Sequence, residues 1–113
     1  MMQNQPSLFD EIEEKIPDEK VILYALGDFQ SRGKLLAGRE LPLERLLGAF
    51  HRAFDRYGIE PLNDRDLAEI LGRLGAEVIE VPDFVAIHPF RVRVSADLAE
   101  KAKALFDAEN TSD

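Results

Sequence analysis

The stretch that decides the fold reads PLERLLGAFHRAFDRYG (residues 42–58) and then IEPLNDRDLAEILGRLG (residues 59–75). In its first half, apolar side chains recur every three or four residues up to Tyr57, the spacing that gathers them on one face of an α-helix. Pro42 suits the first position of this helix, and Gly58 suits its end. We therefore expect an amphipathic helix over residues 42–57.

The second half predicts another helix with a sharp start and end. Asn63 precedes Asp66 by three residues, which resembles a capping box with Asp in place of Glu. Apolar residues then recur from Leu67 to Leu74, and Gly75 ends the pattern. The four-residue connection 59–62 is short enough for the two helices to pack as a pair.

The flanking sequence predicts the remaining elements. A helix is expected over residues 18–32, with Asp18 as its cap, and residues 34–41 are left open between a brief strand and a loop. Residues 77–81 and 84–94 are rich in β-branched and aromatic residues around a Pro-Asp turn, which favours a β-hairpin. Ser95 can cap a last helix.

The order of these elements is that of a winged helix-turn-helix, an α+β fold that is mainly α. Three elements with matched apolar stripes have nowhere else to bury them, so we expect one shared core. Its predicted members are Leu46, Phe50, Phe54, Leu67, Ile70, Leu71, Leu74, Phe90 and Val92.

Charge divides the chain into three parts. The formal net charge is −8, but the acids gather at the two ends, and residues 19–106 carry only −1. We expect a flexible acidic arm over residues 1–17, a winged-helix domain over 18–107 and a disordered tail over 108–113. The absence of cysteine and of a long apolar run predicts a cytoplasmic protein without disulfides or membrane contact.

Residues 42–94 resemble the winged-helix domain at the end of phage and plasmid primase-helicases. The resemblance lies in three features: an apolar helix with paired aromatics, a polar-proline link, and a helix that closes in Leu-Gly. The residues are Leu46, Phe50 and Phe54, then Glu60, Pro61 and Leu62, and then Leu67 to Leu74 with Gly75. The resemblance implies a winged-helix fold. The catalytic motifs of the primase-helicases are absent from this sequence.

The arm contains Gln5-Pro6-Ser7-Leu8-Phe9, which resembles the pentapeptide that replication and repair proteins insert into the bacterial sliding clamp. Leu8 and Phe9 would fill an apolar pocket, and Gln5 would bond at its rim. Pro6 departs from the family's Leu. The alternative is that Leu8 and Phe9 pack onto the domain itself.

Seven arginines could contact nucleic acid phosphates, as in a winged helix whose third helix enters a major groove. Three are expected on the outward face of the helix 42–57, two beside the next helix and two on the hairpin: Arg45, Arg52 and Arg56; Arg65 and Arg73; Arg91 and Arg93. The alternative is that they form local ion pairs on solvated faces.

Nothing in the sequence pairs a nucleophile with a base, and His51 and His88 match no metal-ligand spacing, so neither catalysis nor a metal, cofactor or small-molecule substrate is expected. The leading hypothesis is a non-enzymatic accessory protein of bacterial DNA replication or repair. Its arm would bind the sliding clamp and its winged helix DNA or protein. The alternatives are a transcription regulator that reads duplex DNA and a protein-interaction module unrelated to DNA.

Overall fold

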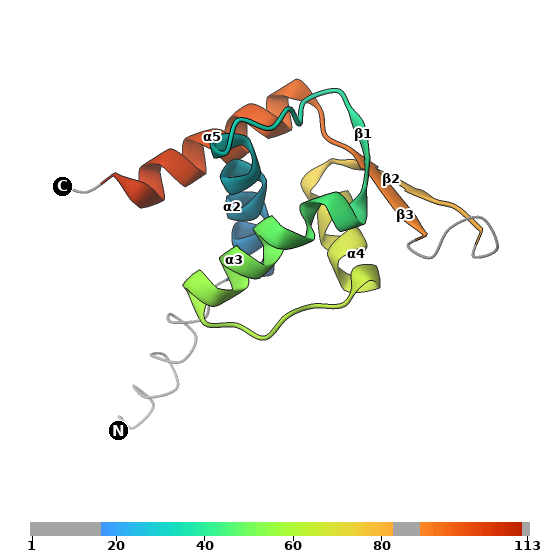
Figure 1. Cartoon of the computed structure of the whole chain (residues 1–113), viewed down its shortest axis with the longest axis horizontal. Helices are drawn as coiled ribbons and strands as arrows, with labels where there is room; N and C mark the ends of the chain where they lie inside the picture. The colour runs from blue at the N-terminus through green and yellow to red at the C-terminus, as the bar shows by residue number, and fades with distance from the viewer. Residues whose placement is uncertain (1–16, 83–88, 112–113) are drawn as a thin grey trace, which may run out of the picture.

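In the computed structural model, which describes residues 17–82 and 89–111, helix α2 (Asp18–Ser31) lies at the centre of the domain (Figure 1). Every residue from Val21 to Phe29 is buried. A helix that is apolar on nearly all sides has to be surrounded by other elements. Accordingly, α2 packs against three further helices, of which α5 and α3 make the most extensive contacts.

The paired helices of the deciding stretch are present, with one shifted boundary. Helix α3 spans Leu47–Tyr57 and α4 spans Asp64–Leu74, and each ends at a glycine with positive φ, Gly58 at 67° and Gly75 at 106°. The prediction that Pro42 begins the first of these helices is wrong. Pro42 ends a strand, and the single 3₁₀ turn η1 (Leu43–Leu46) separates it from α3.

The helix starts follow the predicted caps in two of three cases. The Asn63 side chain accepts a hydrogen bond from the backbone N–H of Asp66, and the Ser95 hydroxyl accepts one from the N–H of Leu98. In α2 the N-cap is Pro17 and not Asp18, which is already helical. The last helix, α5 (Ala96–Asn110), continues beyond residue 107, where the sequence places the start of the polar tail.

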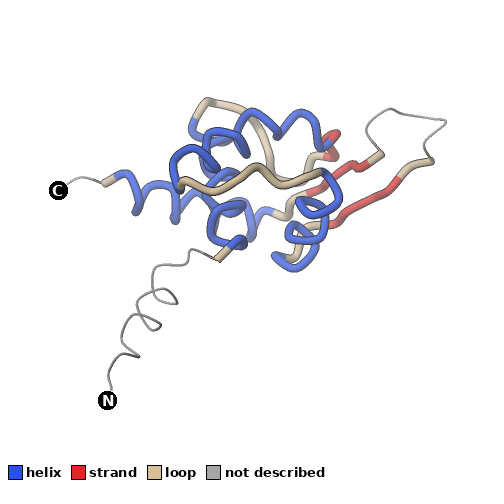
Figure 2. The backbone as a smooth tube through the Cα atoms, turned by 90° about the horizontal axis from the view of Figure 1, so that it is seen from below, coloured by secondary structure: helices blue, strands red, loops and turns tan. Residues whose placement is uncertain are grey.

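A three-stranded antiparallel sheet in the order β1-β3-β2 covers one end of the helices. Its strands are β1 (Glu40–Pro42), β2 (Glu77–Glu80) and β3 (Phe90–Arg93). The segment left open in the sequence therefore supplies a strand. Figure 2 shows β2 and β3 extending away from the helices. Residues 83–88, which include the start of the predicted second hairpin strand, lie outside the described residues.

The predicted core is confirmed. Eight of the nine predicted residues are buried within one apolar cluster, and the ninth, Leu74, is partly buried against it. Residues of α2 contribute most of the rest of the centre, together with the inner face of α5 and buried residues between Leu36 and Leu43. One core thus joins the helices to the sheet.

Helices α2 and α5 approach each other most closely at Gly27. A Cβ atom at this position would overlap the carbonyl oxygen of Ala102 and would lie 2.5 Å from Cβ of Phe106. Nearby, the Gln30 side chain donates a hydrogen bond of 2.8 Å to the carbonyl oxygen of Ala99. The absence of a side chain at residue 27 allows this contact between the helices.

Candidate interaction surface

The two hairpin arginines point to the outer face of the sheet, as the alternation of β3 predicts. Arg91 donates from Nε to Glu40 at 2.6 Å, and Arg93 bonds both Glu40 at 3.2 Å and Glu77 at 3.0 Å. The register explains these contacts, because Glu40 and Glu77 lie opposite Arg93 on the two neighbouring strands. Two arginines and two glutamates therefore share this face.

The two arginines of α4 also contact carboxylates. Arg65 lies 3.2 Å from Glu80 of β2, and its guanidinium stands 5.3 Å from the centre of the Phe90 ring. Arg73 reaches Glu19 at the start of α2, at 3.0 Å. Hydrogen bonding to the backbone at the helix start and to Arg73 lowers the pKa of Glu19.

Helix α4 is acidic overall. It carries Asp64, Asp66 and Glu69 against Arg65 and Arg73, which gives a net charge of −1. The first two acids lie in the first turn, where the N-terminal end of the helix dipole favours negative charge. A helix that enters a major groove has to approach phosphates on both sides, and this charge opposes the approach.

Arg52 is part of the domain's structure. Its guanidinium contacts the carboxylate of Asp28 at 2.5 Å, and Arg32 reaches the same carboxylate at 3.4 Å. Asp28 is only 6% exposed and is the buried charged residue among those the structure describes. The pair links α2 to α3 at a point where an unpaired carboxylate would be costly.

Arg56 holds the end of α5. It donates to the backbone oxygen of Glu109 at 2.9 Å and to the side chain of Asn110 at 3.3 Å. Its guanidinium also stacks on Tyr24 at 4.8 Å from the ring centre. Beside it, the Tyr57 hydroxyl donates to the Glu109 carboxylate. The pKa of Tyr57 is raised, first by partial burial of the hydroxyl and second by the neighbouring Glu109 carboxylate.

The seven candidate arginines lie in different parts of the described structure. Of the three arginines expected on the outward face of the helix 42–57, Arg52 is partly buried and bonds to Asp28 of α2, whereas Arg56 is exposed and bonds to Glu109 at the end of α5. Arg45 is exposed and makes no ion pair with another described residue. The hairpin arginines lie together, and Arg65 reaches β2 beside them, whereas Arg73 bonds to the start of α2.

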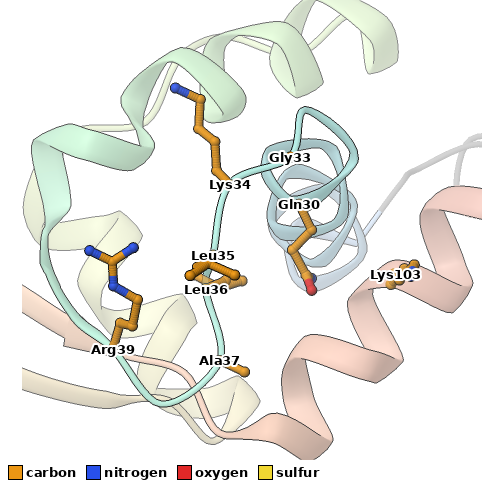
Figure 3. A pocket seen from close by; sticks show the side chains of 8 residues that line it. All are labelled: Gln30, Gly33, Lys34, Leu35, Leu36, Ala37, Arg39 and Lys103. Atoms are coloured by element: carbon orange, nitrogen blue, oxygen red, sulfur yellow. The ribbon is translucent and has the colours of Figure 1, made fainter.

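A basic groove lies elsewhere, beside the loop that joins α2 to β1, and the sequence reasoning missed it. Figure 3 shows its lining: Gln30 from α2, Lys34, Leu35 and Arg39 from the loop, and Lys103 from α5. The cavity volume is about 390 Å³, and none of the described residues that line it is acidic. The sequence does contain a signal for this groove, the adjacent residues Leu35 and Leu36. Two successive leucines in a short loop cannot both face the core, so one of them has to lie at the surface.

The arm residues assigned to the clamp lie outside the described residues: Gln5, Ser7, Leu8 and Phe9. Across residues 17–82 and 89–111, no three His, Asp or Glu side chains are placed to hold a metal ion. No helix in that part of the chain is long and apolar enough to cross a bilayer.

No protein-family model, no curated protein and no solved structure matches the chain.

Proposed function

We propose that this protein is a non-enzymatic adapter of bacterial DNA replication or repair, with a winged helix-turn-helix body that binds another protein and an arm that binds the sliding clamp. The element order supports the fold assignment. A helix, a short strand, two helices, a hairpin and a helix follow each other, and the short strand pairs with the second hairpin strand. The resemblance of residues 42–94 to the primase-helicase domain rests separately on the spacing of apolar residues in that stretch.

The charge of the face that would approach duplex DNA is the single observation that favours a protein partner. In a winged helix-turn-helix, the third helix would be α4, which has a net charge of −1, and the outer face of the sheet has no net charge. Nonspecific duplex binding depends on cations that neutralise phosphates. Five of the seven candidate arginines already contact carboxylates of the same chain.

A duplex titration tests the body's partner class. The intact chain is titrated against a labelled 20-base-pair duplex by fluorescence anisotropy at 20 and 150 mM NaCl. We expect binding weaker than about 0.1 mM at the higher salt, the weak end of nonspecific affinities. The double variant Arg91→Ala, Arg93→Ala should behave as the unchanged chain does.

The opposite result would identify the protein as a duplex reader, which is the transcription-regulator alternative. It would consist of micromolar binding at 150 mM NaCl that weakens in the double variant. Each lost phosphate contact would also reduce the salt dependence by about 0.9 in slope. Lys101→Ala is the control, because Lys101 is an exposed cation on α5 and is not one of the seven candidate phosphate contacts.

The arm is tested separately, with a purified bacterial sliding clamp and the intact chain in a calorimetric titration. Burial of Leu8 and Phe9 favours binding, and the cost of ordering the arm opposes it, so we expect an affinity on the order of micromolar to millimolar. The double variant Leu8→Ala, Phe9→Ala should abolish the heat signal, and Asn4→Ala, just outside the pentapeptide, should preserve it. Equal binding by all three chains would refute the role of the arm.

A further inference from the structure

The basic groove combines free positive charge with an exposed apolar side chain. Leu35 is 70% exposed, more than any other large apolar residue in the described part of the chain. Lys34, Arg39 and Lys103 surround it, and none of them makes an ion pair with another described residue. This contrasts with the arginines of α4 and the hairpin, which contact carboxylates nearby.

These features define the chemistry of an occupant. Three cations around one leucine suit a segment that offers carboxylates beside a bulky apolar side chain, because each group then has a complementary contact. A phosphate backbone would satisfy the cations but would leave Leu35 against charged oxygens. An acidic apolar peptide therefore fits the groove better than a nucleic acid does.

The chain itself contains such a segment. Residues 8–14 read LFDEIEE, with apolar residues at 8, 9 and 12 and acids at the other four positions. Elsewhere, the acids of the chain are interspersed with basic residues, as on α4 and α5.

The length of the arm allows the contact within one molecule. The nine residues from Leu8 to Ile16 span at most about 30 Å when extended. Helix α2, which separates Pro17 from the groove, is about 21 Å long at 1.5 Å per residue. The first part of the segment can therefore reach the groove.

We propose that residues 8–11 of the arm dock in this groove of their own chain. Leu8 and Phe9 cover Leu35, and the carboxylates of Asp10 and Glu11 lie beside the amines of Lys34 and Lys103. The proposal concerns a contact within the protein and holds or fails without the sliding clamp.

Zero-length crosslinking of the intact chain tests this contact. A carbodiimide joins a carboxylate to a lysine amine only when the two groups touch, and peptide mass spectrometry locates the bond. We expect crosslinks from Asp10 or Glu11 to Lys34 and Lys103 at several times the yield seen at Lys101. Lys101 is the matched control, because it is an exposed lysine on the same helix but borders a different hollow, near Gly75.

Two further measurements make the result decisive. Leu35→Ser should reduce the yield at Lys103 by roughly tenfold, the factor expected for the loss of one buried apolar side chain, without changing the yield at Lys101. Crosslinking an equal mixture of ¹⁵N-labelled and unlabelled chains should give bonds within single molecules only. Equal yields at Lys101 and Lys103, no effect of Leu35→Ser, or bonds between labelled and unlabelled chains would each overturn the docking proposed here.

Discussion

Gly27→Ala is expected to weaken the domain although it adds only one methyl group. Gly27 lies inside α2, where alanine is ordinarily preferred to glycine by about 1 kcal/mol. At this position, however, the new methyl would meet the backbone carbonyl of Ala102 and Cβ of Phe106. Neither obstacle can rotate away, so α2 and α5 have to separate.

The size of the effect follows from these two opposing contributions. A Cβ atom at residue 27 would lie 2.5 Å from Cβ of Phe106, whereas carbon atoms in ordinary contact are about 3.5–4.0 Å apart. The helices therefore have to move apart by about 1 Å. Overpacking of a well-packed core costs roughly 1–3 kcal/mol, and rigid obstacles favour the upper end. After the gain in helix propensity, the free energy of unfolding should fall by about 2 kcal/mol.

Gly72→Ala provides the matched control in another helix. A Cβ atom at residue 72 of α4 would meet no other atom within 4 Å, so only the helix preference changes. This variant should gain about 0.5–1 kcal/mol. Urea denaturation followed by far-ultraviolet circular dichroism measures both variants. If their free energies of unfolding agree within about 0.5 kcal/mol, the close approach of α2 and α5 at Gly27 is refuted.

Four further changes test other parts of the structure. Phe54→Ala should cost about 3–5 kcal/mol in a denaturant melt, since Phe54 is a fully buried core residue, and a loss under about 1 kcal/mol would contradict the packing. Ser95→Ala should cost about 1 kcal/mol by removal of the α5 cap, measured in the same way. Asp28→Asn should cost about 1–3 kcal/mol, less than for a fully buried pair because its arginine partners are half exposed, and an unchanged melt would exclude a structural role for the pair. The folded-state pKa of Glu19 is lowered, so Glu19 contributes its full stability above pH 4.5 and loses it as the pH falls through the lowered pKa. Glu19→Gln should therefore flatten the acid limb of a stability curve recorded between pH 6 and 2. An unaltered limb would contradict this contribution.

The sequence was informative wherever the decisive interactions are local. The ends of α3 and α4 at Gly58 and Gly75 and the caps at Asn63 and Ser95 depend on residues within four positions of each other. The alternation of β3 likewise predicts which side chains are buried. Such features are set by backbone geometry and by one or two neighbours, which the sequence displays directly.

The parts that could not be predicted depend on distant partners. The segment 34–41 is ambiguous alone, and β1 forms because β3, some fifty residues later, offers a free edge. The arginine partners are equally remote: Arg52 meets Asp28, and Arg73 meets Glu19. A helical pattern shows only that such a side chain avoids the apolar stripe, and the neighbouring helices decide what it contacts.

The order of the sheet has a consequence for how this protein is made. The central strand β3 is the last to be synthesised, and both β1 and β2 pair with it and not with each other. The contact of α2 with α5 likewise joins the two ends of the domain. On the ribosome, a nascent chain can pair α3 with α4 early. It leaves both outer strands unpaired until translation passes residue 93, and one side of α2 uncovered until translation passes residue 110. Unpaired strand edges promote association between chains, so slow translation through the hairpin would prolong the period in which newly made molecules can aggregate.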